Sequence, residues 1–346
     1  MGYRVGVVGA TGLVGEVALR ILEERKLPVD ELRVFASQRS AGRKLPWAGG
    51  EVQLELPTAQ RLRGLDVAIG ATSSELARVW VPVAVAEGVV VVDNSSAYRM
   101  DPDVPLVIPE INPQDLERHR GIVANPNCTA AVALMAVAPI HKAARILSMI
   151  STSFQSVSGT GRAALEEMLE QAGKAVDQVD ALRGDEPLDL PDPRAYPHLS
   201  AFNVIPQCET FPTGDTTTTE EAKLAGETRK ILGDPDIVVH ATAVRVPVAV
   251  GHAVSLSLSL ERPLSPEEAR DLVAAAPGVA LHDEPWDGDY PTPLRSAGLD
   301  DVLVGRIRAN TALPNGLAVF AAGDNLRKGA ALNTIQIAEA LLGFEP

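Results

Sequence analysis

Cysteine is scarce in this sequence: among 346 residues only Cys128 and Cys208 occur. Two thiols are too few for a disulfide framework, and neither C-x-x-C nor H-E-x-x-H spacing is present, so we expect no structural metal. No uninterrupted apolar stretch is long enough to cross a membrane. The chain enters its first apolar run without a charged and then hydrophobic leader, which predicts a soluble, cytoplasmic protein.

Positive charge is also in short supply. The chain has 31 lysines and arginines against 45 aspartates and glutamates, which gives a formal charge of -14. Such a protein repels nucleic acids and anionic membranes, so we expect neither as a partner. Any anionic small molecule must be held by local cations. Hydrophobic residues are nevertheless plentiful, at 46%, which is enough for a large core and two domains.

Two kinds of hydrophobic pattern follow one another along the chain. Up to about residue 130, short β-branched runs such as "YRVGVVGA" alternate with helical stretches, which indicates a parallel sheet covered on both faces. Further on, "SMISTSFQSVS", "DIVVHATAVRVPVAV" and "HAVSLSLSLE" alternate apolar with polar residues, which predicts antiparallel strands of a second, α+β domain. The last helix, "GAALNTIQIAEALLG", has the apolar spacing to pack back on the first domain. Between these elements, residues 183–200 are rich in proline and acid and predict a surface excursion.

A glycine-rich turn follows the first predicted strand. Gly9, Gly12 and Gly15 in "VGVVGATGLVGEVALRIL" lie where small residues let a backbone approach a pyrophosphate at a helix N-terminus. The spacing is G-x-x-G-x-x-G, and glycines at such a place can also serve the turn alone. Because the motif opens the first βαβ unit, we interpret it as a dinucleotide site.

The end of the second predicted strand indicates which dinucleotide is bound. NAD sites usually have a carboxylate here for the ribose hydroxyls, whereas this chain has Ser37, Gln38, Arg39 and Ser40. Hydroxyls and a guanidinium suit a 2′-phosphate, so we predict NADP. The alternative is that Arg39 is an ordinary solvated arginine.

Cys128 is the candidate nucleophile. In "IVANPNCTAAVAL" a short strand and an Asn-Pro-Asn turn bring the thiol to the start of a helix, where the helix dipole favours the thiolate. Cys208, in "VIPQCETFP", is interpreted as structural. For the base we choose His252, because in "RVPVAVGHAVSLSL" its polar ring interrupts an apolar strand. A histidine packed in the core is the alternative for that position.

Taken together, these motifs resemble the aspartate-semialdehyde dehydrogenase family over essentially the full length. The motifs that carry the resemblance are "GATGLVG", "ASQRSAG", "DNSSAYRM", "NPNCT", "FQSVSGTG", "EEAKLAGETRKIL", "RVPVAVGH" and "GDNLRKGAALNTIQIAE". The resemblance implies a Rossmann-like NADP-binding domain over residues 1–127 plus 325–346 and an α+β catalytic and dimerisation domain over residues 128–324. It also implies a homodimer, with a tetramer of dimers as the alternative.

The resemblance further implies a reaction and a role for each site residue. The reaction is the NADP-dependent reductive dephosphorylation of L-aspartyl 4-phosphate to the semialdehyde, in the biosynthesis of lysine, threonine, methionine and diaminopimelate. Cys128 forms an acyl-thioester, His252 is the general acid and base, and Gln155 orients the substrate. Arg245 binds the substrate carboxylate and Glu220 faces its amino group, whereas Arg99, Asn127 and Lys223 hold the phosphate. The residues implied for NADP are Gly9, Thr11, Gly12, Leu13, Val14, Ser37, Arg39, Ser40, Ser158, Gly159 and Asn325.

Three alternatives stay open at this point. An N-acetyl-glutamyl-phosphate reductase would share the nucleotide fold, the thiol and the histidine, but its acylated substrate would give Glu220 no cation to face. A scaffold or a simple NADP-binding module would be expected to have lost Cys128 or His252. Glu220 and Lys223, three residues apart on one helix, also fit an ordinary surface ion pair.

Overall fold

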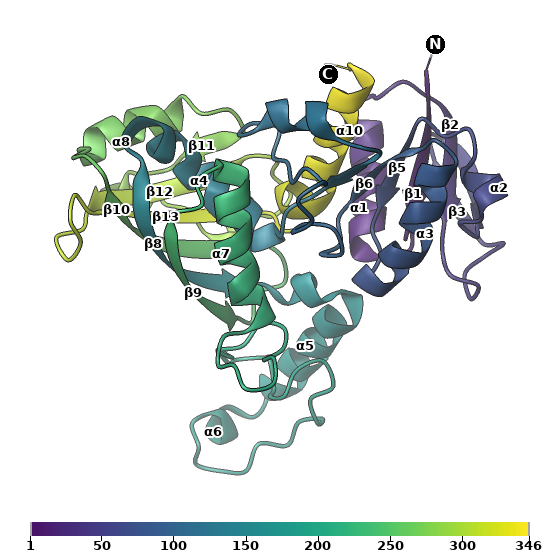
Figure 1. Cartoon of the computed structure of the whole chain (residues 1–346). Coiled ribbons are helices and arrows are strands. Elements are labelled where there is room, and N and C mark those ends of the chain that lie inside the picture. Colours follow the sequence, from purple (N-terminus) through teal and green to yellow (C-terminus); the bar gives the residue numbers. More distant parts are fainter. Residues whose placement is uncertain (1, 345–346) are drawn as a thin grey trace. The chain divides into compact units, whose positions relative to one another are not determined.

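The chain divides into two compact units. The computed structural model describes residues 2–344, and their contacts define a first unit that comprises the chain up to Ala138, Gly226–Ile237 and the chain from Leu326 onward (Figure 1). The second unit comprises Pro139–Ala225 and Val238–Asn325. The predicted domain boundaries after residues 127 and 324 are not tested by this division and stay predictions.

A seven-stranded sheet forms the centre of the first unit, in the order β3-β4-β2-β1-β5-β6-β7. Its neighbouring strands run parallel except β3 and β4, which form an antiparallel hairpin at one edge. This confirms the predicted parallel sheet. The elements are β1 (Tyr3–Val8), α1 (Leu13–Glu24), β2 (Val29–Phe35), β3 (Lys44–Trp47), β4 (Gly50–Glu55), α2 (Ala59–Leu62), β5 (Val67–Gly70), α3 (Ser74–Ala86), β6 (Val90–Asp93), η1 (Pro113–Arg118), β7 (Ile122–Ala124), η4 (Arg327–Ala331) and α10 (Leu332–Leu342).

Helices cover both faces of this sheet. Successive residues of its strands point to opposite faces, so neighbouring residues join different core clusters. On β5, Val67 and Ile69 join a core cluster with α1 and α10, whereas Ala68 joins a second cluster with α3. Helix α10 lies in the first unit, as its apolar spacing predicts. A doubly covered parallel sheet confirms the Rossmann-like class.

The second unit is built on a six-stranded mixed sheet in the order β11-β12-β13-β10-β8-β9. Helices α4 and α7 each run from one unit into the other, since α4 begins before the division at residue 138 and α7 crosses that at residue 226. The remaining elements are α4 (Cys128–Ala144), β8 (Ile146–Gln155), η2 (Val157–Thr160), α5 (Arg162–Ala175), α6 (Val179–Leu182), α7 (Thr219–Leu232), β9 (Val238–Arg245), β10 (His252–Leu260), α8 (Pro266–Ala274), β11 (Val279–Leu281), η3 (Pro285–Asp287), α9 (Pro293–Ser296), β12 (Val302–Ala309) and β13 (Leu317–Gly323).

The prediction of antiparallel strands was wrong for one pair. Strand β10 is antiparallel to both β8 and β13, but β8 and β9 run parallel through eight paired residues. Parallel neighbours need a long crossover connection, and here α5, α6 and α7 lie between the two strands in the chain. Alternation of apolar and polar residues reports a half-exposed face, not the direction of the neighbouring strand.

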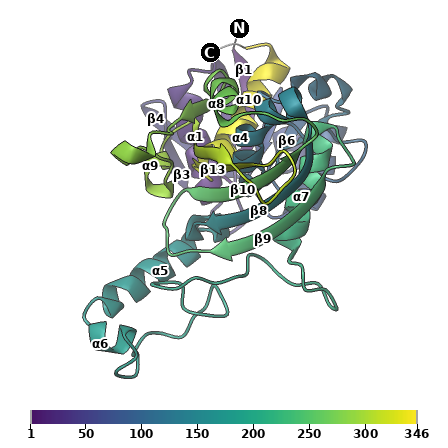
Figure 2. The same ribbon diagram turned by 90° about the vertical axis from the view of Figure 1, so that its left-hand side faces the viewer.

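The proline-rich segment lies beyond α6 and contains no helix or strand between Arg183 and Val204 (Figure 2). Most of its residues are exposed, which confirms a surface excursion. Within the described chain, no helix is long and apolar enough to span a membrane.

Candidate active site

The predicted residues of the first unit gather at the carboxyl edge of its parallel sheet. Backbone hydrogen bonds join the ends of neighbouring strands: Ala71 N donates to Val8 O (2.7 Å) and Asn125 N donates to Asp93 O (2.8 Å). The glycine turn therefore follows β1, and the Asn-Pro-Asn turn follows β7, at the same edge. Ligands of open α/β sheets bind at this edge.

The glycine turn is built so that no side chain fits. Gly9 has a φ of +92°, and a Cβ there would lie 2.2 Å from Ala71 O. A Cβ on Gly15 would lie 2.3 Å from Gly9 O, so both positions require glycine. Helix α1 begins at Leu13, and Gly12 gives it no side-chain cap. Because glycine has no side chain that could cap the first N–H groups of α1, these groups suit an anion such as a pyrophosphate.

The loop after β2 has the chemistry predicted for a 2′-phosphate. Ser40 N donates to Ser37 O (2.9 Å), which makes a turn directly after the strand. Arg39 lies in this turn with an exposed side chain, and no carboxylate belongs to residues 36–43. The residues present thus fit NADP.

Cys128 is the first residue of α4, as the sequence predicts. The thiol is partly exposed, whereas Cys208 is buried. Asn127 caps the helix, since its Oδ1 accepts from the backbone N–H groups of Thr129 (2.9 Å) and Ala130 (3.1 Å). Asn127, predicted to hold phosphate, therefore also fixes the start of the helix that presents the thiol.

Arg99 is buried and engaged on all three of its nitrogens. Nε donates to Asn125 O (2.8 Å), Nη2 donates to Asn94 O (2.8 Å), and Nη1 donates to Glu227 Oε1 (3.1 Å). The other oxygen of Glu227 accepts from Asn127 N (2.6 Å). One buried carboxylate thus ties Arg99 to the turn that precedes Cys128.

In the second unit, Ser156 organises the predicted residues. Its N–H donates to His252 Nδ1 (3.1 Å), its hydroxyl lies 3.0 Å from the same atom, and its carbonyl accepts from Arg245 Nη1 (2.6 Å). The hydroxyl also donates to Asn325 Oδ1 (3.0 Å), which accepts from Ser158 Oγ (3.2 Å) as well. Because Nδ1 accepts a backbone N–H, the neutral ring of His252 carries its proton on Nε2.

Burial determines the charge state of His252. The ring is fully buried, and this burial, together with the nearby charge of Arg245, lowers the pKa of His252 to about 3. A Cβ on Gly159 would lie 3.2 Å from two atoms of the ring and 3.3 Å from Arg245 Nη1. His252, Arg245 and Gly159 therefore lie side by side.

The predicted substrate residues on α7 contact β8. Gln155 Nε2 donates to Glu220 Oε1 (3.1 Å), and both side chains are buried. Lys223 lies 3.7 Å from Glu220 Oε2 and pairs more closely with Glu209. The eight predicted residues of the second unit thus fall into two groups, one around Ser156 and one made by Gln155, Glu220 and Lys223, which meet at the adjacent residues Gln155 and Ser156. Lys223 does form the i,i+3 ion pair considered as an alternative, but with a buried Glu220 rather than on the surface. These eight are Gln155, Ser158, Gly159, Glu220, Lys223, Arg245, His252 and Asn325.

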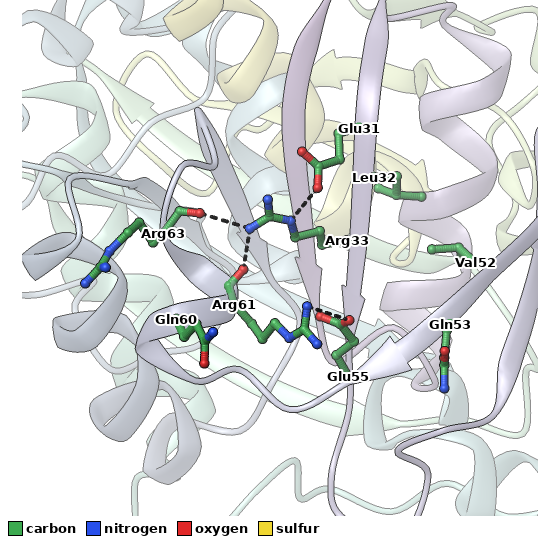
Figure 3. A pocket seen from close by; sticks show the side chains of 9 residues that line it. All are labelled: Glu31, Leu32, Arg33, Val52, Gln53, Glu55, Gln60, Arg61 and Arg63. Carbon is green, nitrogen blue, oxygen red and sulfur yellow. Dashed lines mark hydrogen bonds and ion pairs between the residues drawn. The ribbon is translucent and has the colours of Figure 1, made fainter.

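A cavity elsewhere in the first unit contains none of the predicted residues. It measures about 370 Å³ and lies where β2 and β4 separate, because these strands pair only at their carboxyl ends (Figure 3). Its charged groups are already paired: Arg33 with Glu31 at 2.7 Å and Arg61 with Glu55 at 3.5 Å. Among residues 2–344, no group of three or more histidine, cysteine, aspartate or glutamate side chains is placed to hold a metal ion.

Sequence reasoning missed Ser156, Glu227 and Tyr196. Glu227 is four residues after Lys223 on the same helix, so helical spacing was the available signal. Ser156 lies within the motif "FQSVSGTG", next to Gln155, but nothing in the sequence distinguishes it from the other serines of that motif. Tyr196 lies in the proline-rich segment, where no periodicity points to a buried role.

Comparison with family models covers most of the chain. Residues 4–119 match the model "Semialdehyde dehydrogenase, NAD binding domain", and residues 137–328 match "Semialdehyde dehydrogenase, dimerisation domain".

Curated relatives and solved structures agree with these models. The chain is 44% identical over 345 residues to an aspartate-semialdehyde dehydrogenase of Aquifex aeolicus, with 99% of this chain and 98% of the relative covered. It is 45% identical over 345 residues to one of Mycolicibacterium smegmatis, with 97% and 98% covered. The crystal structure of aspartate semialdehyde dehydrogenase II from Vibrio cholerae superposes with a TM-score of 0.90 at 38% identity and 99% coverage of both chains, and a second one is described as complexed with ASA. The predicted resemblance, dinucleotide-binding fold and oxidoreductase class are confirmed.

Proposed function

The chain belongs to the aspartate-semialdehyde dehydrogenase family, NADP-dependent oxidoreductases of amino-acid biosynthesis, and from this premise we propose which of its residues perform each step. The reaction converts L-aspartyl 4-phosphate to L-aspartate 4-semialdehyde and phosphate. The observation that carries the assignment is Cys128, a partly exposed thiol at the first residue of a helix. A thiolate is both a good nucleophile and a good leaving group, which this reaction needs in turn.

The cofactor is held by the turn after β1 and the loop after β2. Gly9, Thr11, Gly12, Leu13 and Val14 present backbone N–H groups to the pyrophosphate, whereas the group formed by Ser37, Arg39 and Ser40 takes the 2′-phosphate. From the second unit, Ser158, Gly159 and Asn325 are proposed to contact it. NADPH supplies the hydride that reduces the thioester when it is bound.

Separate cations bind the two anionic groups of the substrate. Arg245 binds the carboxylate, and Glu220, held by Gln155, faces the amino group. Arg99 binds the phosphate with Asn127 and Lys223. A guanidinium has five N–H donors and Arg99 uses three of them within its own unit, so two remain for phosphate oxygens. This separation of clamps suits a substrate with two anionic ends in a protein of charge -14.

The bonds break and form in a balanced sequence. The Cys128 thiolate attacks the acyl carbon, the C–O bond to phosphate breaks, and a thioester forms on the sulfur. After reduction of the thioester, the C–S bond breaks and releases the aldehyde together with the thiolate. One proton is taken up with the departing phosphate, and we assign its exchange to His252. The neutral ring carries its proton on Nε2, which donates a hydrogen bond to the substrate oxygen as that oxygen gains negative charge. For the ring to pass on a proton from Nε2, Nδ1 must first gain one, which breaks its hydrogen bond from Ser156 N and leaves the Ser156 hydroxyl as its acceptor.

The assignment is tested by following NADPH absorbance with aspartate semialdehyde, NADP and inorganic phosphate, each omitted in turn. We expect a strict need for phosphate and a preference for NADP over NAD. Cys128→Ala is expected to abolish turnover while NADP still binds, and Cys208→Ala, the matched control, to retain turnover. Activity only with N-acetyl-glutamate semialdehyde would assign the chain to the alternative reductase, and near-normal turnover by Cys128→Ala would refute the thioester.

A homodimer formed through the second unit's sheet completes the proposal. The match to a dimerisation domain over residues 137–328 supports self-association. Ile150 of β8 is exposed and paired in register with His240 and Ser257, which places an apolar residue on an open sheet face. Light scattering after size exclusion is expected to give a dimer, and Ile150→Arg a monomer. A mass of four chains would favour the tetramer, and the cytoplasmic location stays a prediction of the sequence.

A further inference from the structure

The proline-rich segment is fastened to α5 by two buried polar side chains. Glu167 accepts hydrogen bonds from the backbone N–H groups of Arg194 (2.9 Å) and Ala195 (3.1 Å). Gln171 Oε1 accepts from the N–H groups of Ser200 (2.9 Å) and Ala201 (3.2 Å). Both Glu167 and Gln171 are buried, although the segment itself has no regular structure. Its course from residue 194 to residue 201 is therefore defined.

This course places Tyr196 beside Arg245. The phenol hydroxyl donates to Thr160 Oγ1 (2.8 Å), and the Arg245 Cζ atom lies 5.5 Å from the centre of the ring. A guanidinium over an aromatic face at this distance is attracted by the ring quadrupole. Burial raises the pKa of Tyr196 although Arg245 lowers it, so the phenol is neutral at pH 7.

The remaining contacts of Arg245 leave its charge uncompensated. The side chain is 5% exposed, Nη1 donates to the carbonyl of Ser156, and Nε has no hydrogen-bond partner among the described residues. Within residues 2–344 no carboxylate lies within ion-pair distance of it, whereas Arg99 and Lys223 both have one. A buried cation with neutral partners is costly unless an anion arrives.

We propose that Tyr196 is a positioning residue for the substrate carboxylate, holding the Arg245 guanidinium by its ring without neutralising it. This inference rests on the proposed role of Arg245. A carboxylate in place of the ring would fix the guanidinium equally well, but the substrate would have to displace it. The ring attracts the cation through its face and leaves the N–H groups at the edge of the guanidinium to form a planar, bidentate pair with a carboxylate.

The proposal makes the ring, rather than the hydroxyl, the important part of Tyr196. Tyr196→Met keeps most of the volume but has no ring, and we expect it to raise the KM for aspartate semialdehyde about tenfold while kcat and the KM for NADP change less than twofold. Tyr196→Phe keeps the ring and is expected to stay within about threefold of the wild-type KM. Tyr290→Met is the matched control, because Tyr290 lies in the same unit, its side chain is exposed, and the hydrogen bond it receives from Arg295 is accepted by its backbone carbonyl.

A double-mutant cycle separates action through Arg245 from general destabilisation. If Tyr196 acts through Arg245, Tyr196→Met will cause no further loss of kcat/KM in an Arg245→Leu background. Equal losses in both backgrounds, or a loss by Tyr196→Phe as large as that by Tyr196→Met, would overturn the proposal. Should Tyr196→Met fail to fold, Glu167→Gln is the substitute, because it weakens the hydrogen bonds that hold the segment around Tyr196 without changing the ring. For the proposal to stand, Glu167→Gln must raise the KM for aspartate semialdehyde and leave kcat and the KM for NADP unchanged. An unchanged KM in Arg245→Leu would instead refute the proposed role of Arg245.

Discussion

Two buried arginines, one in each unit, differ in what surrounds their charge. Arg99 donates one hydrogen bond from each nitrogen and pairs with the buried carboxylate of Glu227. Arg245 donates one hydrogen bond to a carbonyl and lies against an aromatic ring. The charge of Arg99 is thus neutralised without a ligand and two of its five N–H donors are left for one, whereas Arg245 has no carboxylate partner and most of its donors are left. Equal burial therefore goes with different functions, and the partners of the charge distinguish them.

The largest expected effect on stability comes from removing Arg99. Arg99→Leu leaves Glu227 buried without its cation, and we expect the free energy of unfolding to fall by about 3–5 kcal/mol. Denaturant unfolding of the holoenzyme measures this change. Arg118→Leu, which breaks an exposed pair with Asp115, is the control and should cost about 0–1 kcal/mol.

The double variant Arg99→Met, Glu227→Leu sharpens this prediction. It leaves no unpaired charge, so most of the lost stability should return. The KM for phosphate should stay raised, because Arg99 is still absent. A double variant as unstable as Arg99→Leu would show that the hydrogen bond from Asn127 to Glu227, rather than the ion pair, is what stabilises this turn.

Removing Arg245 is expected to have the opposite profile. Arg245→Leu should lower kcat/KM for aspartate semialdehyde about 10²- to 10³-fold, since truncating a buried charge that pairs with a ligand costs about 2–5 kcal/mol. The free energy of unfolding should stay equal or rise, because an uncompensated buried cation is removed. Steady-state kinetics and denaturant unfolding on the same preparation test both halves. A loss of stability as large as that of Arg99→Leu would contradict the comparison.

The third prediction concerns the pH dependence of stability through His252. Its pKa is about 3 in the folded chain and near 6.5 unfolded, so only the unfolded state binds the proton between these values. The contribution of the neutral ring to the free energy of unfolding is fully present above pH 6.5 and is lost as the pH falls toward 3. From pH 6.5 to 5 this loss is about 1.5 kcal/mol.

Comparing wild type with His252→Gln at pH 7, 6 and 5 isolates that contribution. The free energy of unfolding of the wild type should fall relative to that of His252→Gln as the pH falls. Arg245→Leu should weaken the trend, because the nearby guanidinium is the second cause, after burial, of the lowered pKa. A difference that is constant across this range would contradict a buried, neutral His252.

The contrast between the two arginines also shows what the sequence can and cannot predict. Periodicity predicted the parallel sheet, and the turn residues placed Cys128 at the start of α4. Motifs named Arg99 and Arg245 but not their partners. Glu227 lies within "EEAKLAGETRKIL" without a role of its own and Tyr196 lies in no motif, and they contact arginines that are 128 and 49 residues away in the chain. Long-range pairing also decided the parallel direction of β9, which local alternation cannot encode.

The smallest effect is expected for a third arginine that is not buried. Arg39 is exposed in the loop after β2, so Arg39→Ala should leave stability within about 0.5 kcal/mol of wild type. Loss of one charged hydrogen bond to a 2′-phosphate should raise the KM for NADP about tenfold and leave that for NAD unchanged, because NAD has no such group. Arg43→Ala, in the same loop, is the control. An unchanged KM for NADP would show that Arg39 is an ordinary solvated arginine without a role in cofactor binding. Burial would then distinguish Arg99 and Arg245, the two arginines proposed to bind substrate, from Arg39.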